Sequence, residues 1–322
     1  MPSEATPDGV IQDSVIQDSV IQDSVIQDGV IQDSVIHDIG FRHYDGPRLG
    51  RGWAFRSLLL ETIRGAFGLG RPARVKAMPM VLLGLVAATA LIMAAVTILT
   101  GAEEPIVPYS QFVGGMWLLI AMFVAGRAPY AVSRDLRDGV MPLYLSRPLK
   151  RSDYVFAKFA GVSIATFIFI AIPLAMLLIG SLLAKFPVGH ETWTWLGALL
   201  MAAVLSVLLA ALGLALAAIT KRRGLGVAAI MTYLVLAVAF AAILAEVLSF
   251  KASEGVSAYA SLLNPFALVD ALAGSWLGVV VSDPNYQPHG LLSGAVLTAG
   301  LIIQVGVCVA ILVRRFKKEG GA

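Results

Sequence analysis

The chain has 322 residues, of which 58% are hydrophobic and only 14% are charged. This composition is typical of a protein whose solvent is mostly lipid and excludes an ordinary water-soluble domain. The single cysteine, Cys308, excludes an internal disulfide framework. The net charge of +3 indicates a nucleic-acid partner only if the basic residues share one surface, so their placement along the chain decides its meaning.

The first 40 residues are dominated by a five-residue repeat, VIQDS, which begins at Val10 and ends as VIHDI at Ile39. A five-residue step turns a helical face by about 140° and reverses the face of a strand, so neither element keeps the Val-Ile pairs on one side. The aspartates lack the alternate-residue spacing of a calcium loop. We therefore expect residues 1–40 to be a disordered, acidic cytoplasmic tail.

Residues 41–77 are predicted to contain an amphipathic helix that lies in the headgroup layer of a membrane. Two faces define it: an apolar stripe of Trp53, Leu60, Ile63 and Phe67, and an opposite face with Arg56, Glu61 and Arg64. Such a helix either anchors the chain to the membrane surface or transmits movement from a partner.

Six stretches are long and apolar enough to cross a hydrocarbon core about 30 Å thick. The second is short and is expected to begin nearer Pro108, and the third contains Pro173, which predicts a kink. We expect an all-α integral membrane protein with six transmembrane helices in residues 78–318, followed by a tail at 319–322. The stretches are 78–99, 112–125, 155–183, 195–219, 225–248 and 291–313.

The basic residues are sorted by the side of the membrane. Of the 24 Lys and Arg, 22 precede the first stretch, follow the sixth, or lie in the connections after the second and fourth or at their edges. The positive-inside rule therefore predicts that both termini are cytoplasmic. Because topology explains the basic surplus, no nucleic-acid partner is expected, and the plasma membrane is the expected location.

The cytoplasmic connection between the second and third stretches is too elaborate for a simple turn. Val132, Leu136 and Val140 recur at helical spacing, which predicts a short amphipathic helix that ends at Gly139. Ser152 is a candidate N-cap for the third stretch, with Asp153 where the helix dipole favours a carboxylate. The connection either contacts lipid headgroups or forms a docking surface for a cytoplasmic partner.

Residues 134–158, RDLRDGVMPLYLSRPLKRSDYVFAK, resemble the first cytoplasmic loop of type 2 ATP-binding-cassette (ABC) permeases. Six stretches with cytoplasmic ends extend the resemblance over roughly residues 42–318. It implies a pore-forming subunit, usually of an exporter, that pairs with a second copy or a sister permease. It also implies that a coupling helix in this loop docks on a separate ATPase subunit, with Arg134, Asp135, Leu136, Arg137, Asp138, Leu143 and Tyr144.

The same resemblance makes the amphipathic helix before the first stretch a connecting helix, with Trp53, Arg56, Leu60 and Arg64 as its residues. It also implies an external gate between the fifth and sixth stretches. There an apolar run, 262–281, is interrupted by Asn264, Pro265 and Asp270. A seventh span would place the basic C-terminus outside, so we expect a re-entrant or surface-lying pair of short helices.

Other classes of function fit the sequence less well. The phosphate-binding pattern G-x-x-x-x-G-K-[ST] does not occur, so the chain is expected to bind no cofactor, with ATP and Mg on the partner subunit. An intramembrane enzyme would need catalytic groups at matching depth, but all four histidines lie outside the spans. A secondary transporter or channel would need coupling carboxylates or a polar stripe within the spans, whereas Glu246 and Asp270 lie outside their middle. The apolar spans favour a lipophilic cargo.

Overall fold

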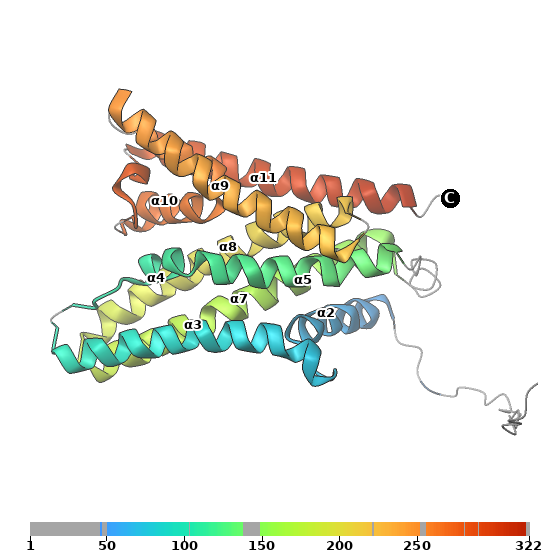
Figure 1. Ribbon diagram of the computed structural model, residues 1–322, viewed down its shortest axis with the longest axis horizontal. Helices are drawn as coiled ribbons and strands as arrows, with labels where there is room; N and C mark the ends of the chain where they lie inside the picture. The colour runs from blue at the N-terminus through green and yellow to red at the C-terminus, as the bar shows by residue number, and fades with distance from the viewer. Residues whose placement is uncertain are drawn as a thin grey trace, which may run out of the picture. The chain divides into compact units, whose positions relative to one another are not determined.

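The computed structural model describes residues 46, 50–102, 104–137, 149–220, 222–251, 256–279, 281–288 and 290–319, in which every regular element is a helix (Figure 1). The all-α prediction is confirmed for this part of the chain, while the predicted tail, 1–40, lies outside it. The helices are α2 (Arg51–Phe67), α3 (Ala73–Thr100), α4 (Tyr109–Gly115), α5 (Trp117–Arg137), α7 (Arg151–Leu183), α8 (Val188–Ile219), α9 (Arg223–Lys251), the 3-10 helix η1 (Ser257–Leu263), α10 (Pro265–Leu277), the 3-10 helix η2 (Pro284–Tyr286) and α11 (Gly290–Glu319).

Five of these helices, α3, α7, α8, α9 and α11, are long and apolar enough to cross a membrane. A sixth span is formed if α4 and α5 are taken together, because these two apolar helices meet at a bend of 59°. The second predicted stretch begins at Tyr109, directly after Pro108, which confirms the expected earlier start. Six candidate spans therefore correspond to the six apolar stretches of the sequence.

The structure corrects the expected end of the second span. We predicted a separate amphipathic helix after residue 127, but residues 127–137 continue α5 without a break. Ala128, Val132 and Ser133 are buried, and the Ser133 hydroxyl donates to the Ala217 carbonyl oxygen of α8 at 3.1 Å. Packing against α8 thus extends the helix beyond its most apolar part.

Helix α7 has α2, α3 and α8 as its main neighbours. Two of these contacts use a glycine of α7, because an added Cβ at Gly161 would lie 2.6 Å from Thr62 Cβ, and one at Gly180 would lie 2.4 Å from Ala94 Cβ. Small residues of this kind let helix backbones approach closely in membrane proteins.

The start of α7 differs slightly from the prediction. The N-cap is Lys150, not Ser152, and the backbone N–H of Lys150 donates to Asp153 Oδ2 at 3.0 Å. Asp153 does lie in the first turn, where a carboxylate is favoured by the helix dipole.

The segment before the last span contains the short helices η1 and α10, and their predicted re-entrant or surface-lying position stays a prediction. Asn264 caps α10, since its Oδ1 accepts the Phe266 N–H at 3.0 Å, and Pro265 is the first helical residue. Gly278, with φ 65°, ends the helix. α10 is too short to be a seventh span. Its partner η1 is held to α11, because Gln304 Nε2 donates to the Leu262 carbonyl oxygen at 2.7 Å.

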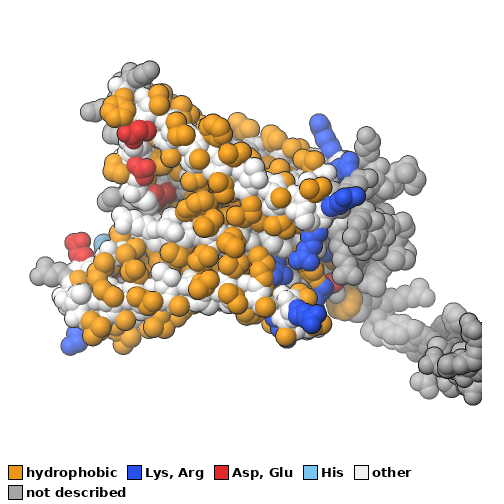
Figure 2. Space-filling model, viewed as in Figure 1, with side chains coloured by type: hydrophobic (Ala, Val, Ile, Leu, Met, Phe, Trp, Pro, Cys, Tyr) orange, Lys and Arg blue, Asp and Glu red, His pale blue; other side chains and the backbone are white. Residues whose placement is uncertain are grey.

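Charged side chains are distributed unevenly over the compact unit 49–322. Figure 2 shows most of the described Lys and Arg at the end where α2 and the C-terminal end of α11 lie, and Asp and Glu gathered at the opposite end. Between the two ends the visible face is predominantly hydrophobic, as expected for a surface that contacts lipid.

Candidate functional site

A carboxylate-guanidinium pair joins the starts of α2 and α7 at the basic end. Arg51 donates through Nε to Asp153 Oδ2 at 2.6 Å and through Nη2 to Asp153 Oδ1 at 2.5 Å. The hydrogen bond to Asp153 raises the pKa of Arg51. The Asp153 side chain is 12% exposed and that of Arg51 is 51% exposed, so the pair reaches from the packed helix end to the surface. A bidentate pair of this kind fixes orientation as well as distance.

A second polar cluster joins α5 to α7 close to the first. The Tyr154 hydroxyl donates to Asp135 Oδ2 at 2.5 Å, and Lys158 Nζ lies 3.2 Å from the same oxygen. Tyr154 and Lys158 are buried, and the Tyr154 ring packs against Phe316 of α11 with centroids 5.3 Å apart. The last turn of α5 and the first turns of α7 are therefore held together, on either side of residues 138–148.

Of the residues predicted to dock an ATPase, Asp135 is the one whose side chain the structure describes, and it contacts α7. Arg134, Leu136 and Arg137 belong to α5 by their backbone. The rest of the predicted docking set, Asp138, Leu143 and Tyr144, lies outside the described residues.

The structure divides the predicted apolar stripe of α2. Trp53 and Leu60 are 54% and 50% exposed and line a shallow groove of about 530 Å³ together with Arg56 and Arg64, whereas Phe67 is buried. The face turned to the core includes small residues where α7 approaches closely at Gly161. Its buried residues are Leu58, Thr62, Gly65, Ala66 and Phe67.

This exposed face combines large apolar and basic side chains, which is the composition of a helix that lies on a membrane surface. The residues predicted for the connecting helix are therefore brought together, although on one face instead of two.

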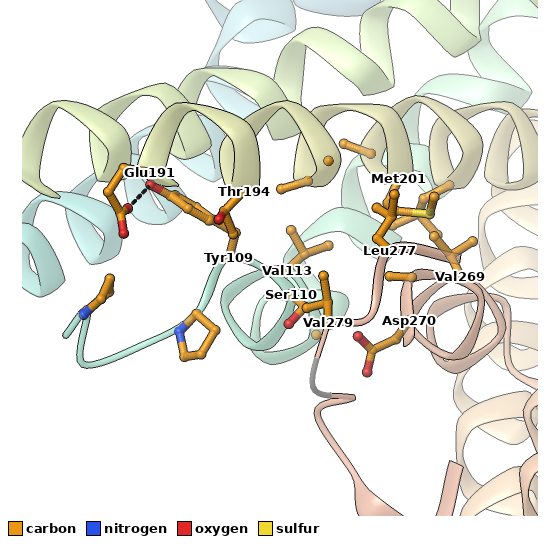
Figure 3. A pocket seen from close by; sticks show the side chains of 18 of the residues that line it. Tyr109, Ser110, Val113, Glu191, Thr194, Met201, Val269, Asp270, Leu277 and Val279 are labelled. Atoms are coloured by element: carbon orange, nitrogen blue, oxygen red, sulfur yellow. Dashed lines mark hydrogen bonds between the residues drawn. The ribbon is translucent and has the colours of Figure 1, made fainter. Parts of the chain in front are cut away.

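At the acidic end a cavity of about 410 Å³ lies between α4, α8 and α10 (Figure 3). Tyr109, at the start of α4, donates its hydroxyl hydrogen to Glu191 Oε2 of α8 at 3.0 Å. Both side chains are buried, with 6% and 4% exposure. This contact joins residues 82 positions apart, which is why sequence patterns alone did not reveal it.

Asp270 lines the same cavity from α10. Its Oδ2 accepts the backbone N–H of Ser282 at 2.7 Å, whereas Oδ1 is buried without a hydrogen-bond partner among the described residues. Burial raises the pKa of Asp270 and nearby Asp283 adds to the rise, while the bonds from Ser282 oppose it. Asn264 and Pro265, the other predicted gate residues, form the capped start of the helix that carries Asp270.

Metal binding is not indicated at this cavity. Among the described residues no group of three or more His, Cys, Asp or Glu side chains could hold a metal ion.

The comparisons with known proteins agree with the helical architecture. A family model described as "ABC-2 family transporter protein" matches residues 8–320. A search of curated proteins finds no match. The family match covers every described helix, including the candidate spans and the segment between α5 and α7. The chain therefore belongs to the ABC-2 transporter family, as a multi-pass membrane permease subunit.

Proposed function

We propose that this subunit forms the translocation pathway of an exporter for a lipophilic small molecule, in the plasma membrane, and that a separate ATPase subunit docks on residues 134–148. Family membership implies the ATPase partner. The observation that carries the docking site is the pair of polar clusters, Arg51–Asp153 and Asp135–Tyr154–Lys158, which flank this loop. A force applied to the loop would reach α2, α5 and α7 together.

The concentration of Lys and Arg at the α2 end supports a cytoplasmic position for that end and for both termini (Figure 2). In this orientation α2 lies at the cytoplasmic membrane surface as the connecting helix, and its exposed Trp53, Arg56, Leu60 and Arg64 contact lipid. The cavity and α10 then lie at the external side, where Asn264, Pro265 and Asp270 belong to an external gate.

The chain itself is proposed to be no enzyme and to bind no cofactor, so ATP and Mg act on the partner. Two permease subunits, either identical or sister chains, complete the pathway. Residues 78–318 supply the membrane domain, 41–77 the connecting helix, and 1–40 and 319–322 the cytoplasmic tails. The lipophilic cargo is inferred from the apolar walls of the spans.

The docking proposal is tested by co-purification of the chain with its ATPase. Changing Asp135, Leu136 and Tyr144 together to alanine is expected to release the ATPase. Because Asp135 also contacts Tyr154 and Lys158 inside the subunit, the double variant Leu136→Ala/Tyr144→Ala is measured beside it. An intact complex in the triple variant would show that the docking surface lies elsewhere.

Two further measurements separate docking from folding and from other transport mechanisms. Leu291→Ala/Leu292→Ala removes two highly exposed leucines at the opposite end and should leave the complex intact. In proteoliposomes, transport should require ATP and the ATPase. Uptake driven by an ion gradient without ATP would instead favour a secondary transporter.

A further inference from the structure

The cavity between α4, α8 and α10 holds carboxylates that no described cation neutralises. Glu104, Glu191 and Asp270 line it, and among the described residues that line it His190 is the only basic side chain. Within the described part of the chain, none of the three carboxylates forms an ion pair. The ion pairs found there, Arg51–Asp153 and Lys158–Asp135, lie at the other end. The cavity is therefore an electronegative space.

The buried positions of these polar groups strengthen the point. Glu191 is only 4% exposed, and the one hydrogen bond that its carboxylate accepts from a described residue comes from the neutral Tyr109 hydroxyl. Asp270 Oδ1 and Ser110 Oγ are buried, and neither has a hydrogen-bond partner in the described residues. Buried carboxylates are stable when they are paired with a cation or well hydrogen-bonded. The carboxylates of this cavity have no cation among the described residues, so a bound cation would stabilise them.

The rest of the lining is apolar and sets the kind of cation that fits. Val113, Met201, Val269 and Leu277 project around the space from three helices (Figure 3). At about 410 Å³ the cavity has the size of an organic-ligand site. A bare metal ion would leave these apolar walls unused, and the described residues supply no group of three metal ligands.

We propose that this cavity binds an amphipathic organic cation, with its charge beside one of the two cavity carboxylates, Glu191 or Asp270, and its apolar body against Val113, Met201 and Leu277. The class includes free alkylammonium or arylphosphonium compounds and the amine headgroup of a lipid. This binding belongs to the subunit alone and requires neither ATPase nor ATP. If cation binding is not observed, the proposed transport function still stands. If transport is not observed, the cation-binding proposal still stands.

The test is equilibrium dialysis of labelled tetraphenylphosphonium against the full chain in a neutral detergent, with empty micelles as the blank. Tetraphenylborate, which has the same shape and the opposite charge, is measured in separate samples. Saturable binding of the cation and not of the anion is expected. Equal uptake of both ions, or no saturable uptake of the cation by the folded chain, would overturn the proposal.

Two conservative variants locate the binding. Glu191→Gln can still accept the Tyr109 hydroxyl, and Asp270→Asn can still accept the Ser282 N–H. The variant that lacks the carboxylate in contact with the charge should bind about tenfold more weakly, the value of one charge-assisted contact, and the other variant should change the affinity less. Glu61→Gln on exposed α2 makes the same charge change at the far end and should bind like wild type. Unchanged affinity in both cavity variants, with the fold intact by size-exclusion chromatography, would refute the site.

The source of the cation is identified by repeating the dialysis in nanodiscs. Unchanged affinity when phosphatidylethanolamine is added to phosphatidylglycerol discs supports a free cation as the occupant. Weaker phosphonium binding in the presence of phosphatidylethanolamine supports the lipid amine, provided that this competition disappears in whichever variant, Glu191→Gln or Asp270→Asn, itself weakens phosphonium binding. Competition by phosphatidylethanolamine that persists unchanged in both cavity variants would place the phosphonium site outside this cavity and contradict the proposal.

Discussion

Gly161 of α7 lies so close to Thr62 of α2 that a Cβ added at the glycine would stand 2.6 Å from the threonine Cβ and 3.3 Å from the Leu59 carbonyl oxygen. Such a distance is well inside van der Waals contact, so any side chain at residue 161 must push α2 away. The contact sets how near α2 lies to α7.

Gly161→Ala is expected to lower the apparent melting temperature in detergent and to reduce ATP-dependent transport, because overpacking at a tight contact costs about 1–3 kcal/mol. Gly84→Ala in α3 is the matched control. Both glycines are helical, but a Cβ at Gly84 meets nothing within 4 Å, so only the gain in helix propensity of about 1 kcal/mol applies there. The double variant Gly161→Ala/Thr62→Gly should recover part of the loss. Equal behaviour of the two alanine variants would contradict the proposed contact.

The pair Arg51–Asp153 predicts an asymmetric result on mutation. Arg51→Ala removes the ion pair alone, and because Arg51 is half exposed we expect only a small change in melting temperature. Asp153→Ala also removes the acceptor for the Lys150 N–H, and loss of such a helix cap costs about 1 kcal/mol. Asp153→Ala should therefore be the less stable variant.

A double-mutant cycle on this pair isolates the ion-pair contribution from the cap. In the transporter with its ATPase bound, Arg51→Ala should reduce the rate of ATP-driven transport clearly, although it changes the melting temperature only slightly. If Arg51→Ala instead leaves transport at the wild-type rate, this pair has no part in transmitting movement from the ATPase.

Arg127 in α5 is a buried cation without a described counter-ion. Its side chain is 3% exposed, Nε and Nη1 have no hydrogen-bond partner in the described part of the chain, and Nη2 lies 3.3 Å from Met78 Sδ. A charge that is buried without a partner carries a large desolvation cost, which an apolar side chain of similar length does not have. Arg127→Met is therefore expected to keep or raise the melting temperature. A fall of several degrees would reveal an anionic partner for Arg127 outside the described residues.

The sequence predicted the spans well because crossing a membrane is a local property of length and hydropathy. Each of the six apolar stretches corresponds to a candidate span. The short helices before the last span were predictable for the same reason, since Asn264, Pro265 and Gly278 carry the capping and breaking chemistry in their own positions.

What could not be predicted depends on residues far apart in the chain. The face of α2 that is buried depends on the close approach of Gly161 in α7. The periodicity of the α2 sequence carries no information about a residue of another helix. Asp135 was expected on a docking surface, which stays a prediction, and its contacts with Tyr154 and Lys158 of the next helix were not foreseen. Glu191 was passed over because its partner, Tyr109, lies in an earlier span. The sequence signal that could have indicated this site is Glu191 itself, a lone carboxylate at the start of a long apolar helix.

Deleting residues 2–34, which contain most of the VIQDS repeat, should leave membrane insertion and transport nearly unchanged. The period of five residues gives neither a helix nor a strand a continuous apolar face, so the repeat is expected to contribute no packed core. Membrane fractionation and a transport assay on the truncated chain check this. A loss of transport with normal insertion would assign the repeat a working role.

Asp270 predicts a specific pH dependence of stability. Its pKa in the folded chain is raised above the ordinary value of about 3.9, so between these two values the folded state binds more protons than the unfolded state. The free energy of unfolding therefore falls as the pH rises through this window, and above it the ionised, half-buried carboxylate keeps its full desolvation cost. Asp270→Asn removes the cost while its side-chain oxygen can still accept the Ser282 N–H.

The Asp270→Asn variant should consequently melt at a higher temperature than wild type at pH 7, and the difference should disappear once the pH falls below the ordinary Asp pKa. Melting curves in detergent across this range, with Glu61→Gln as an exposed control, measure the effect. The same substitution is expected to weaken cation binding in the cavity, so Asp270 lowers stability in the empty site and raises affinity in the filled one. A melting difference that stays constant with pH would show that Asp270 carries no proton-linked cost and that burial does not raise its pKa.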